Sequence, residues 1–254
     1  MVFVQESKRV SLSEWDIRSI WGCTRFEYME VGSQGSSGGI ICVWDPEFFQ
    51  LKECCGSRNF LLLQGTIYHS FDCVLMNVYA PTDVSKRGRL WEIIKQLRSK
   101  FLSPWCLEGD FNEIRLISER IGVSRRDRGM REFNDFVDSC EFIDIPMVGR
   151  KFTWGNNQEG ARWSRIDRFL LDPEWLENFN IKLWGLPKIV SDHCPILLME
   201  DERDWGPKPF RFLNAWLLHP SFSKVVREAW EETQLTGWGG FVMHKKLQLL
   251  KRAI

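Results

Sequence analysis

The sequence has no long apolar run, which excludes a protein held in a membrane by an apolar helix. No segment approaches the roughly 18 to 20 consecutive apolar residues that such a helix requires. The first ten residues, MVFVQESKRV, carry Glu6, Lys8 and Arg9 where a signal peptide needs an apolar stretch. These features predict an intracellular protein with no signal peptide or membrane span.

The sequence also has no excess of either charge sign. Lysine plus arginine total 34, and so do aspartate plus glutamate, which makes the formal net charge zero. Overall charge therefore gives no argument for a nucleic-acid partner, and any such argument must rest on a local patch.

Metal-binding cysteine patterns are missing as well. The eight cysteines form no CxxC pair and no Cys/His ligand spacing, so the sequence predicts neither a zinc site nor a disulfide framework. Most of them lie inside apolar runs. We expect reduced, buried thiols and no disulfide-linked partner.

What is present suits a large soluble domain. The 254 residues are 44% apolar and 27% charged, which is ordinary for a globular protein. This length accommodates one large α/β domain, or one domain with a helical appendage.

Short apolar runs alternate with amphipathic helical patterns up to about residue 200. Helical spacing covers residues 90–101 and 133–140. Strands this close together, with few helices, predict an α/β (α+β) protein of two mixed β-sheets packed face to face, with helices outside in a four-layer α/β/β/α sandwich. The expected strands cover residues 38–44, 59–68, 73–81, 104–112, 151–154, 165–171 and 194–200.

The composition changes after residue 200. We expect a first domain over residues 1–200, a charged, Pro/Gly-rich linker over 201–212, and a helical tail over 213–254. In the tail, apolar residues from Phe222 to Trp230 recur at helical spacing.

The stretch EGDFNEI carries the sharpest chemical signal. Asp110 and Asn112 are two residues apart, so on an extended backbone they project to the same face. A carboxylate and an amide together suit metal or phosphate chemistry. The alternative is a Gly-Asp turn closed by a side-chain hydrogen bond, and the motif alone does not decide between the two.

Three other polar groups stand at the ends of expected strands. Asp192 and His193 are adjacent in SDHCPI, and Asp167 could orient a histidine as its acidic partner. Each has an ordinary alternative: a capped turn for the histidine, and pairing with a neighbouring arginine for Asp167. Tyr79, at the end of NVYAPT, is either a rim tyrosine or a phosphate contact.

The order of these motifs resembles the endonuclease/exonuclease/phosphatase superfamily, whose fold is that of deoxyribonuclease I. The segments QES, SGG, NVYAP, GDFN, SRIDR and SDHCPI follow one another as in that superfamily. The text between them is similar to the endonuclease domain of plant non-LTR (LINE-type) retrotransposon polyproteins, over roughly residues 1–235. The tail resembles the segment that leads from that domain toward a reverse transcriptase.

The resemblance implies an Mg²⁺-dependent endonuclease, possible also with Mn²⁺, that nicks DNA at a retrotransposon target site in the nucleus. In that family the matching residues hold the metal or act on the phosphate. Glu6 and Asp192 correspond to metal-site acids, Asp110 and Asn112 to the residues that activate and orient water, and His193, Asp167 and Tyr79 to phosphate-contacting residues and their acidic partner.

The family pattern also predicts a strand before VFVQES, and none precedes it in this sequence. We therefore expect an exposed sheet edge and keep two alternatives. One is a catalytically impaired fragment that at most binds DNA, and the other is a phosphatase of the same superfamily.

One local patch supports DNA binding. Residues 115–131 contain six arginines against two acids and directly follow GDFN. Arg125, Arg126 and Arg128 are the predicted phosphate contacts, although a solvated arginine-rich loop is the ordinary alternative.

Overall fold

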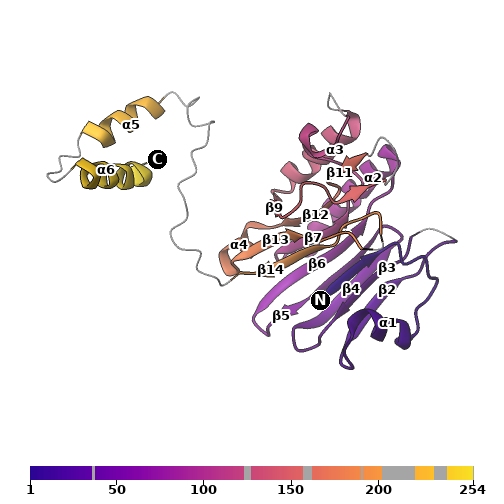
Figure 1. Ribbon diagram of the computed structural model, residues 1–254. Helices are drawn as coiled ribbons and strands as arrows, with labels where there is room; N and C mark the ends of the chain where they lie inside the picture. Colours follow the sequence, from indigo (N-terminus) through magenta and orange to yellow (C-terminus); the bar gives the residue numbers. More distant parts are fainter. Residues whose placement is uncertain are drawn as a thin grey trace. The chain divides into compact units, whose positions relative to one another are not determined.

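The computed structural model describes residues 1–35, 38–122, 127–156, 162–189, 191–201, 221–231 and 239–253 (Figure 1). The chain divides into two compact units, Met1–Glu202 and Arg203–Ile254, which are described separately.

A six-stranded sheet forms the centre of the first unit. Its strands are antiparallel except for one parallel pair, β6 with β7, which is joined through helix α2 (Val84–Arg98). The order across the sheet is β4 (Phe49–Ser57), β5 (Phe60–Ile67), β6 (Phe71–Tyr79), β7 (Trp105–Asp110), β12 (Asp167–Leu171) and β8 (Ile143–Asp144).

Two three-stranded sheets and one short pair complete the β-structure. The first small sheet is β1 (Val2–Gln5), β3 (Ile40–Trp44) and β2 (Glu27–Val31). The second is β14 (Ile196–Glu200), β13 (Ile181–Gly185) and β9 (Met147–Val148). The pair is β10 (Trp154–Gly155) and β11 (Trp163–Ser164).

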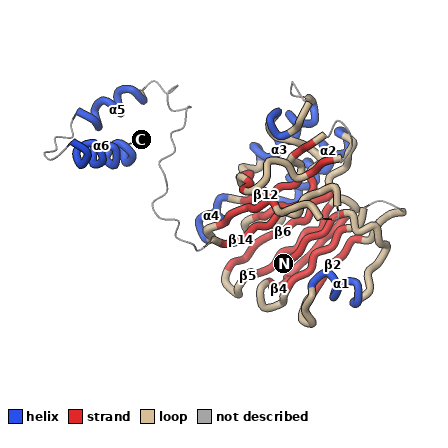
Figure 2. Tube along the Cα trace, in the orientation of Figure 1, coloured by secondary structure: helices blue, strands red, loops and turns tan. Residues whose placement is uncertain are grey.

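Helices cover one face of the six-stranded sheet. Helices α2 and α3 (Arg128–Ser139) pack there around Trp91, whose ring stacks on Phe136 at a centroid distance of 4.8 Å. Each helix begins at an aspartate that caps the first turn: Asp83 accepts from the Lys86 amide at 2.9 Å, and Asp127 from the Met130 amide at 2.8 Å. Figure 2 shows both helices on one side of the strands.

The opposite face of the sheet packs against the two small sheets. Side chains from both layers form one apolar cluster, with Cys42 and Leu183 from the small sheets meeting Leu63, Leu75 and Leu171 from the large one. Helix α1 (Glu14–Trp21) covers the outer side of the first small sheet. Helix α4 (Pro173–Asn178) and a 3-10 turn, Ile117–Glu119, are the remaining helical segments described in this unit.

The predicted mixed α/β class with several sheets is therefore confirmed. The second β-layer differs from the expected single sheet, because β1–β3–β2 and β14–β13–β9 share no strand. The strands expected at 59–68 and 104–112 lie at 60–67 and 105–110. The helix expected from the spacing over residues 90–101 is α2, which begins earlier, at Val84.

In the second unit, α5 (Phe222–Glu231) coincides with the predicted apolar stripe, and α6 (Gly239–Ala253) follows it. The Lys246 ammonium donates to the Trp230 carbonyl at 2.8 Å and lies 5.2 Å from the centroid of its ring. The expected linker, apart from Asp201, lies outside the described residues.

All eight cysteines lie in the described part of the chain and are free thiols, five of them buried. Within the same ranges, no helix combines the length and apolar character needed to cross a bilayer.

Candidate active site

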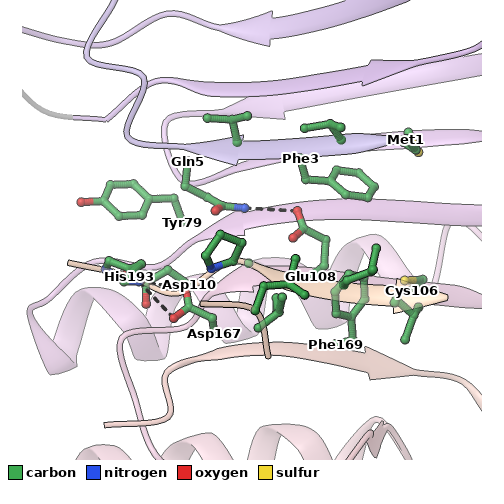
Figure 3. Close-up of a pocket in the computed structure, with 18 of the residues that line it drawn as sticks. Met1, Phe3, Gln5, Tyr79, Cys106, Glu108, Asp110, Asp167, Phe169 and His193 are labelled. Carbon is green, nitrogen blue, oxygen red and sulfur yellow. Dashed lines mark hydrogen bonds and ion pairs between the residues drawn. The ribbon is translucent and has the colours of Figure 1, made fainter. Parts of the chain in front are cut away.

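Three of the predicted site residues lie in one row across the six-stranded sheet. Asp110 on β7 is the register partner of Tyr79 on β6 and of Asp167 on β12. Neighbouring residues at one register position project to the same face of a sheet. Tyr79, Asp110 and Asp167 therefore face the same pocket, although up to 88 positions separate them along the chain (Figure 3).

Gly109 makes this row possible. It adopts φ +131°, a backbone conformation that side chains disfavour, and a Cβ there would lie 2.0 Å from the Val78 carbonyl oxygen on β6. The glycine of GDFN therefore allows β7 to approach β6 where the row is formed.

His193 joins the row through Asp167. The imidazole Nδ1 lies 3.0 Å from each carboxylate oxygen of Asp167 (Figure 3). The segment that carries His193 is fixed by backbone bonds to a neighbouring loop, with the Cys194 amide donating to the Thr153 carbonyl at 2.6 Å. The predicted His–Asp contact is thus present.

The expected alternative for Asp167, pairing with Arg165 or Arg168, is not what the structure contains. Both guanidinium groups turn to the other side of β12 and form ion pairs with Glu119 and Asp144. Because both arginines are ion-paired there, the Asp167 carboxylate is available to pair with His193.

The surroundings of His193 favour its protonated form. Burial alone would lower its pKa, but the hydrogen bond and charge of Asp167, with Asp110 and Asp192 nearby, raise the pKa to about 9. The ring is therefore an imidazolium near neutral pH, with Nδ1–H donating to Asp167.

The pKa of Asp110 is raised as well, which for an acid favours the neutral form. Burial, followed by the charges of Asp167 and Glu6, raises its pKa to about 8, although His193 and the Asn112 amide oppose the shift. A buried carboxyl with this pKa is protonated at neutral pH unless further positive charge arrives. Such a perturbed acid in a pocket is typical of functional sites.

Glu6 reaches the same pocket from the first small sheet. Strand β1 ends at Gln5, and Glu6 takes a left-handed conformation with φ 56°. Its carboxylate accepts a hydrogen bond from the Tyr79 hydroxyl. Burial and this contact raise the pKa of Tyr79, so the tyrosine is a neutral donor.

The expectation that Asn112 extends the strand beside Asp110 is wrong. Strand β7 ends at Asp110, and Asn112 is left-handed with φ 51°. Its backbone amide donates to Asp110 Oδ1 at 2.8 Å, and its side-chain Nδ2 donates to Asp110 Oδ2 at 2.9 Å and to the Ala80 carbonyl at 2.8 Å. The turn alternative was the correct local structure, and it fixes both oxygens of Asp110.

Of the remaining predicted site residues, one lines the pocket, one lies on α3, and two are not described. Asp192 lines the pocket, and its Oδ2 accepts from the Trp154 indole nitrogen at 2.8 Å. Arg128 is the first residue of α3 and forms an ion pair with Glu132 at 2.6 Å. Arg125 and Arg126 lie outside the described residues.

Sequence reasoning missed the polar groups below the row. The Gln5 amide nitrogen donates to Asn77 Oδ1 at 2.6 Å and to Glu108 Oε1 at 3.2 Å, which ties β1 to the larger sheet (Figure 3). Burial raises the pKa of Glu108 well above its usual range. The available signal was a polar residue inside an otherwise apolar strand, since cores admit such residues only with partners.

Thr153 was also missed as a positioning residue. It was assigned to a strand, yet its buried hydroxyl accepts from the Ile166 and Asp167 amides at 3.0 and 3.1 Å. Its carbonyl holds Cys194, as described above. Thr153 therefore connects the two segments that carry Asp167 and His193.

The pocket that these residues line is a groove of about 560 Å³. Its lining contains five acids, Glu6, Glu108, Asp110, Asp167 and Asp192, and no lysine or arginine among the described residues. In the same described ranges, no three His, Cys, Asp or Glu side chains are gathered closely enough to form a ready-made metal cage.

Comparison with known proteins places this geometry in context. No family model matches the chain. Over 175 residues, 66% of this chain, it is 25% identical to the Transposon TX1 uncharacterized 149 kDa protein of Xenopus laevis, and the match spans 13% of that protein's length.

Two solved structures share the architecture. The endonuclease domain of TRAS1, a telomere-specific non-LTR retrotransposon, has a TM-score of 0.56 at 15% identity and covers 69% of this chain and 80% of its own. An AP endonuclease from Archaeoglobus fulgidus has a TM-score of 0.58 at 17% identity and covers 78% and 88%. The chain has the deoxyribonuclease I-like fold of the endonuclease/exonuclease/phosphatase superfamily and is a distant relative of the transposon protein.

Proposed function

We propose that this chain is a Mg²⁺-dependent endonuclease domain of retrotransposon type that hydrolyses a phosphodiester bond of DNA at its target site. The observation that carries the proposal is the His193–Asp167 pair facing Asp110 in a groove rimmed by carboxylates. The relationship to a transposon protein and the fold shared with two endonucleases support the same class of reaction.

The donor set fits Mg²⁺. This ion takes oxygen ligands, usually keeps several waters, and often binds through one or two carboxylates, so a full protein cage is not required. Glu6 and Asp192 would hold it. The groove lining holds five acids and no lysine or arginine among the described residues, and Lys8, outside the lining, lies 3.9 Å from Glu6 Oε2. When bound, the ion supplies positive charge to the non-bridging phosphate oxygens.

The chain's own residues then act on water and phosphate. Asp110, with both oxygens held by Asn112, accepts a proton from the attacking water once added positive charge favours its ionised form. His193 keeps Nδ1 on Asp167, so the Nε2–H of the protonated ring donates to a phosphate oxygen and stabilises developing charge. The Tyr79 hydroxyl orients Glu6.

DNA contact by Arg128 and its neighbours Arg125 and Arg126 remains part of the proposal. Arg128 is largely exposed at the start of α3, with its ion pair to Glu132 at the surface. Surface pairs of this kind are weak, so the guanidinium can exchange Glu132 for a backbone phosphate at little cost.

A plasmid-nicking assay tests the proposed function. The purified chain should convert supercoiled plasmid to the nicked form with Mg²⁺, lose this activity in EDTA, and regain it when Mg²⁺ is restored. His193→Ala should lower the rate by about 10²- to 10⁴-fold, the usual contribution of a positioned acid or base.

The matched control is His69→Ala, because His69 lies in the turn between β5 and β6 rather than in the groove lining. Equal nicking by wild type and His193→Ala would refute the assignment of chemistry to this site. Plasmid binding without Mg²⁺-dependent cleavage would instead support the alternative of a DNA-binding protein without activity.

A further inference from the structure

A small polar cluster lies between β1 and the large sheet, next to the candidate active site. It consists of Gln5 on β1, Asn77 on β6 and Glu108 on β7. Asn77 and Glu108 are buried and Gln5 is half-buried, in a layer that is otherwise mainly apolar. Burial of polar groups has a free-energy cost that hydrogen bonds offset only in part. Apolar side chains would pack this layer without that cost, so the cluster points to a role beyond packing.

The hydrogen bonds of this cluster connect two separate sheets. The Gln5 side-chain nitrogen donates to Asn77 Oδ1 at 2.6 Å and to Glu108 Oε1 at 3.2 Å (Figure 3). Asn77 Nδ2 in turn donates to the Ile41 carbonyl on β3 at 3.0 Å and to the Val4 carbonyl on β1 at 3.3 Å. Side chains of the cluster therefore fix β1 and β3 of the first small sheet against β6 and β7 of the large one.

The cluster is adjacent to the carboxylate proposed to hold the metal. Asn77 and Tyr79 are two residues apart on β6, so their side chains project to the same face of the sheet. Gln5 donates to the first of them, and Glu6, the next residue of the chain, accepts from the hydroxyl of the second. The position of Gln5 over β6 therefore determines where Glu6 lies over the row of the active site.

The backbone at Glu6 depends on anchors on both sides. Glu6 is left-handed with φ 56°, a conformation that a non-glycine residue keeps only when its surroundings impose it. On the C-terminal side, the Ser7 amide donates to the Gly39 carbonyl at 3.1 Å. On the N-terminal side, the Gln5 side chain is the contact that joins β1 to the strands of the row.

We propose that Gln5, held by Asn77 and Glu108, positions the Glu6 carboxylate for the divalent ion, an inference that rests on the proposed function because it concerns the same metal site. Gln5 touches neither the ion nor the phosphate and is a positioning residue. Without its side-chain bonds, β1 keeps its ladder to β3 but can shift over β6, and Glu6 shifts with it. Residues that orient a metal ligand from outside the coordination sphere contribute strongly to metal affinity.

Metal binding to the full chain tests this inference, with Mn²⁺ as the probe and electron paramagnetic resonance as the measure of free ion. Gln5→Met keeps the length of the side chain and removes both hydrogen bonds, so it should weaken Mn²⁺ binding about tenfold. Glu6→Gln should weaken binding at least as much, because it replaces the charged ligand itself.

Two matched variants separate positioning from general effects. Burial and the charge of Asp167 raise the pKa of Glu108, which favours its neutral form, and Glu108→Gln keeps an oxygen that accepts from Gln5. Glu108→Gln should therefore bind Mn²⁺ as the wild type does. Val43→Ala opens a cavity in the same small sheet on the side that packs on α1, so it should lower stability but not Mn²⁺ affinity.

A second readout needs no metal. The Ser7 amide, bonded to the Gly39 carbonyl, should exchange its hydrogen faster in metal-free Gln5→Met than in metal-free Val43→Ala, because only the first substitution releases the chain at Glu6. Hydrogen exchange followed by NMR or mass spectrometry measures the difference.

Three results would overturn the inference. Equal Mn²⁺ affinity in wild type and Gln5→Met would show that the cluster does not act on the site. Equal losses in Gln5→Met and Val43→Ala would assign the effect to stability alone. Absent Mn²⁺ binding, or binding that Glu6→Gln leaves unchanged, would remove Glu6 as the ligand.

The inference and the proposed function can fail separately. If the wild type binds Mn²⁺ through Glu6, and Gln5→Met weakens that binding, but no plasmid is nicked, the proposed function fails and the role of Gln5 stands. If plasmid is nicked and Gln5→Met binds Mn²⁺ as tightly as the wild type, the function stands and the inference fails.

Discussion

At the scale of single residues, the chemistry of the groove depends on how charges are paired. Asp167 lies within 3.0 Å of His193 through both oxygens, and its usual competitors, Arg165 and Arg168, are occupied on the other side of the strand. The carboxylate therefore stabilises an imidazolium. Asp110, one strand away, has no such cationic partner at hydrogen-bonding distance in the described structure and is favoured in its neutral form.

Replacing Asp167 with asparagine should lower the pKa of His193. The raised value of about 9 arises mainly from the hydrogen bond and charge of Asp167, which oppose burial, so removal of that charge should lower the pKa. The measurement is an NMR titration of the imidazole signals in metal-free protein. The His69 signals provide an internal reference, and an unchanged His193 titration would contradict the assignment.

The free energy of unfolding of the metal-free protein should fall as the pH rises from about 6.5 to 9. His193 has a raised pKa in the folded state, so its stabilisation is complete below 6.5 and is lost as the pH passes about 9. Asp110 also has a raised pKa, so its penalty grows as the pH rises from its usual value toward about 8. Both groups bind more protons when folded, and their effects have the same sign.

Urea denaturation at several pH values measures this loss, which should amount to a few kcal/mol. The double variant Asp110→Asn, His193→Ala should show a much flatter profile. Added Mg²⁺ should also reduce the loss if the ion binds the ionised site. A profile that rises with pH would contradict the charge pairing described here.

At the scale of elements, a buried network ties β12 to the loop after β7. Glu119 accepts hydrogen bonds from the Arg165 and Arg168 guanidinium groups and from the Leu116 amide, and Arg168 is fully buried. Because β12 carries Asp167, this network also determines where the acidic partner of His193 lies.

Glu119→Gln should destabilise the protein by about 3–5 kcal/mol, since removing one partner leaves a buried guanidinium charge uncompensated. Thermal or urea denaturation measures the change. Glu92→Gln is the control, because Glu92 pairs with Lys95 at the surface, where ion pairs contribute little. Equal effects of the two substitutions would show that the network carries no special stability.

Sequence patterns correctly predicted the strands that consist of nearly continuous apolar residues. Strands β5, β6 and β7 carry nearly continuous apolar runs and were recognised, whereas β4 was not, because its sequence FQLKECCGS places charged residues on an exposed face of an edge strand. The site residues were found through motif order. The row that unites Tyr79, Asp110 and Asp167 depends on strand register, which no local pattern contains.

Other parts of the site could not be predicted for the same reason. Thr153 holds the Asp167 and Cys194 backbones through contacts that arise only once distant segments meet. The turn at Asn112 was foreseen only as an alternative. Its left-handed backbone follows from where β7 ends, and the spacing of two residues does not reveal that end.

At the scale of the whole molecule, all the described buried core lies in the first unit. The apolar clusters on both faces of the large sheet are formed by residues no later than Leu198, and the latest buried residue is Asp201. The second unit contributes α5 and α6, whose described residues are half-buried or exposed.

A chain ending at Glu202 should therefore fold as well as the full chain. Its thermal midpoint should agree with that of the first transition of the 254-residue protein within about 3 °C, because about 1 kcal/mol shifts a domain of this size by about 2–4 °C. Differential scanning calorimetry compares the two. A drop of more than about 10 °C would show that the second unit stabilises the first.

The row across β6, β7 and β12 makes the spacing of its three side chains independent of the length of the connections between the strands. Hydrogen-bonded registry fixes Tyr79, Asp110 and Asp167 relative to one another, whereas the connections from β6 to β7 and from β7 to β12 contribute no residue to the row itself. Insertions or deletions in those connections reach the row only by shifting a strand, and a one-residue shift would turn every side chain of that strand to the opposite face. The distances among these three side chains therefore do not depend on loop length. Exchange of whole loops between relatives should leave those distances unchanged as long as the strand register is kept.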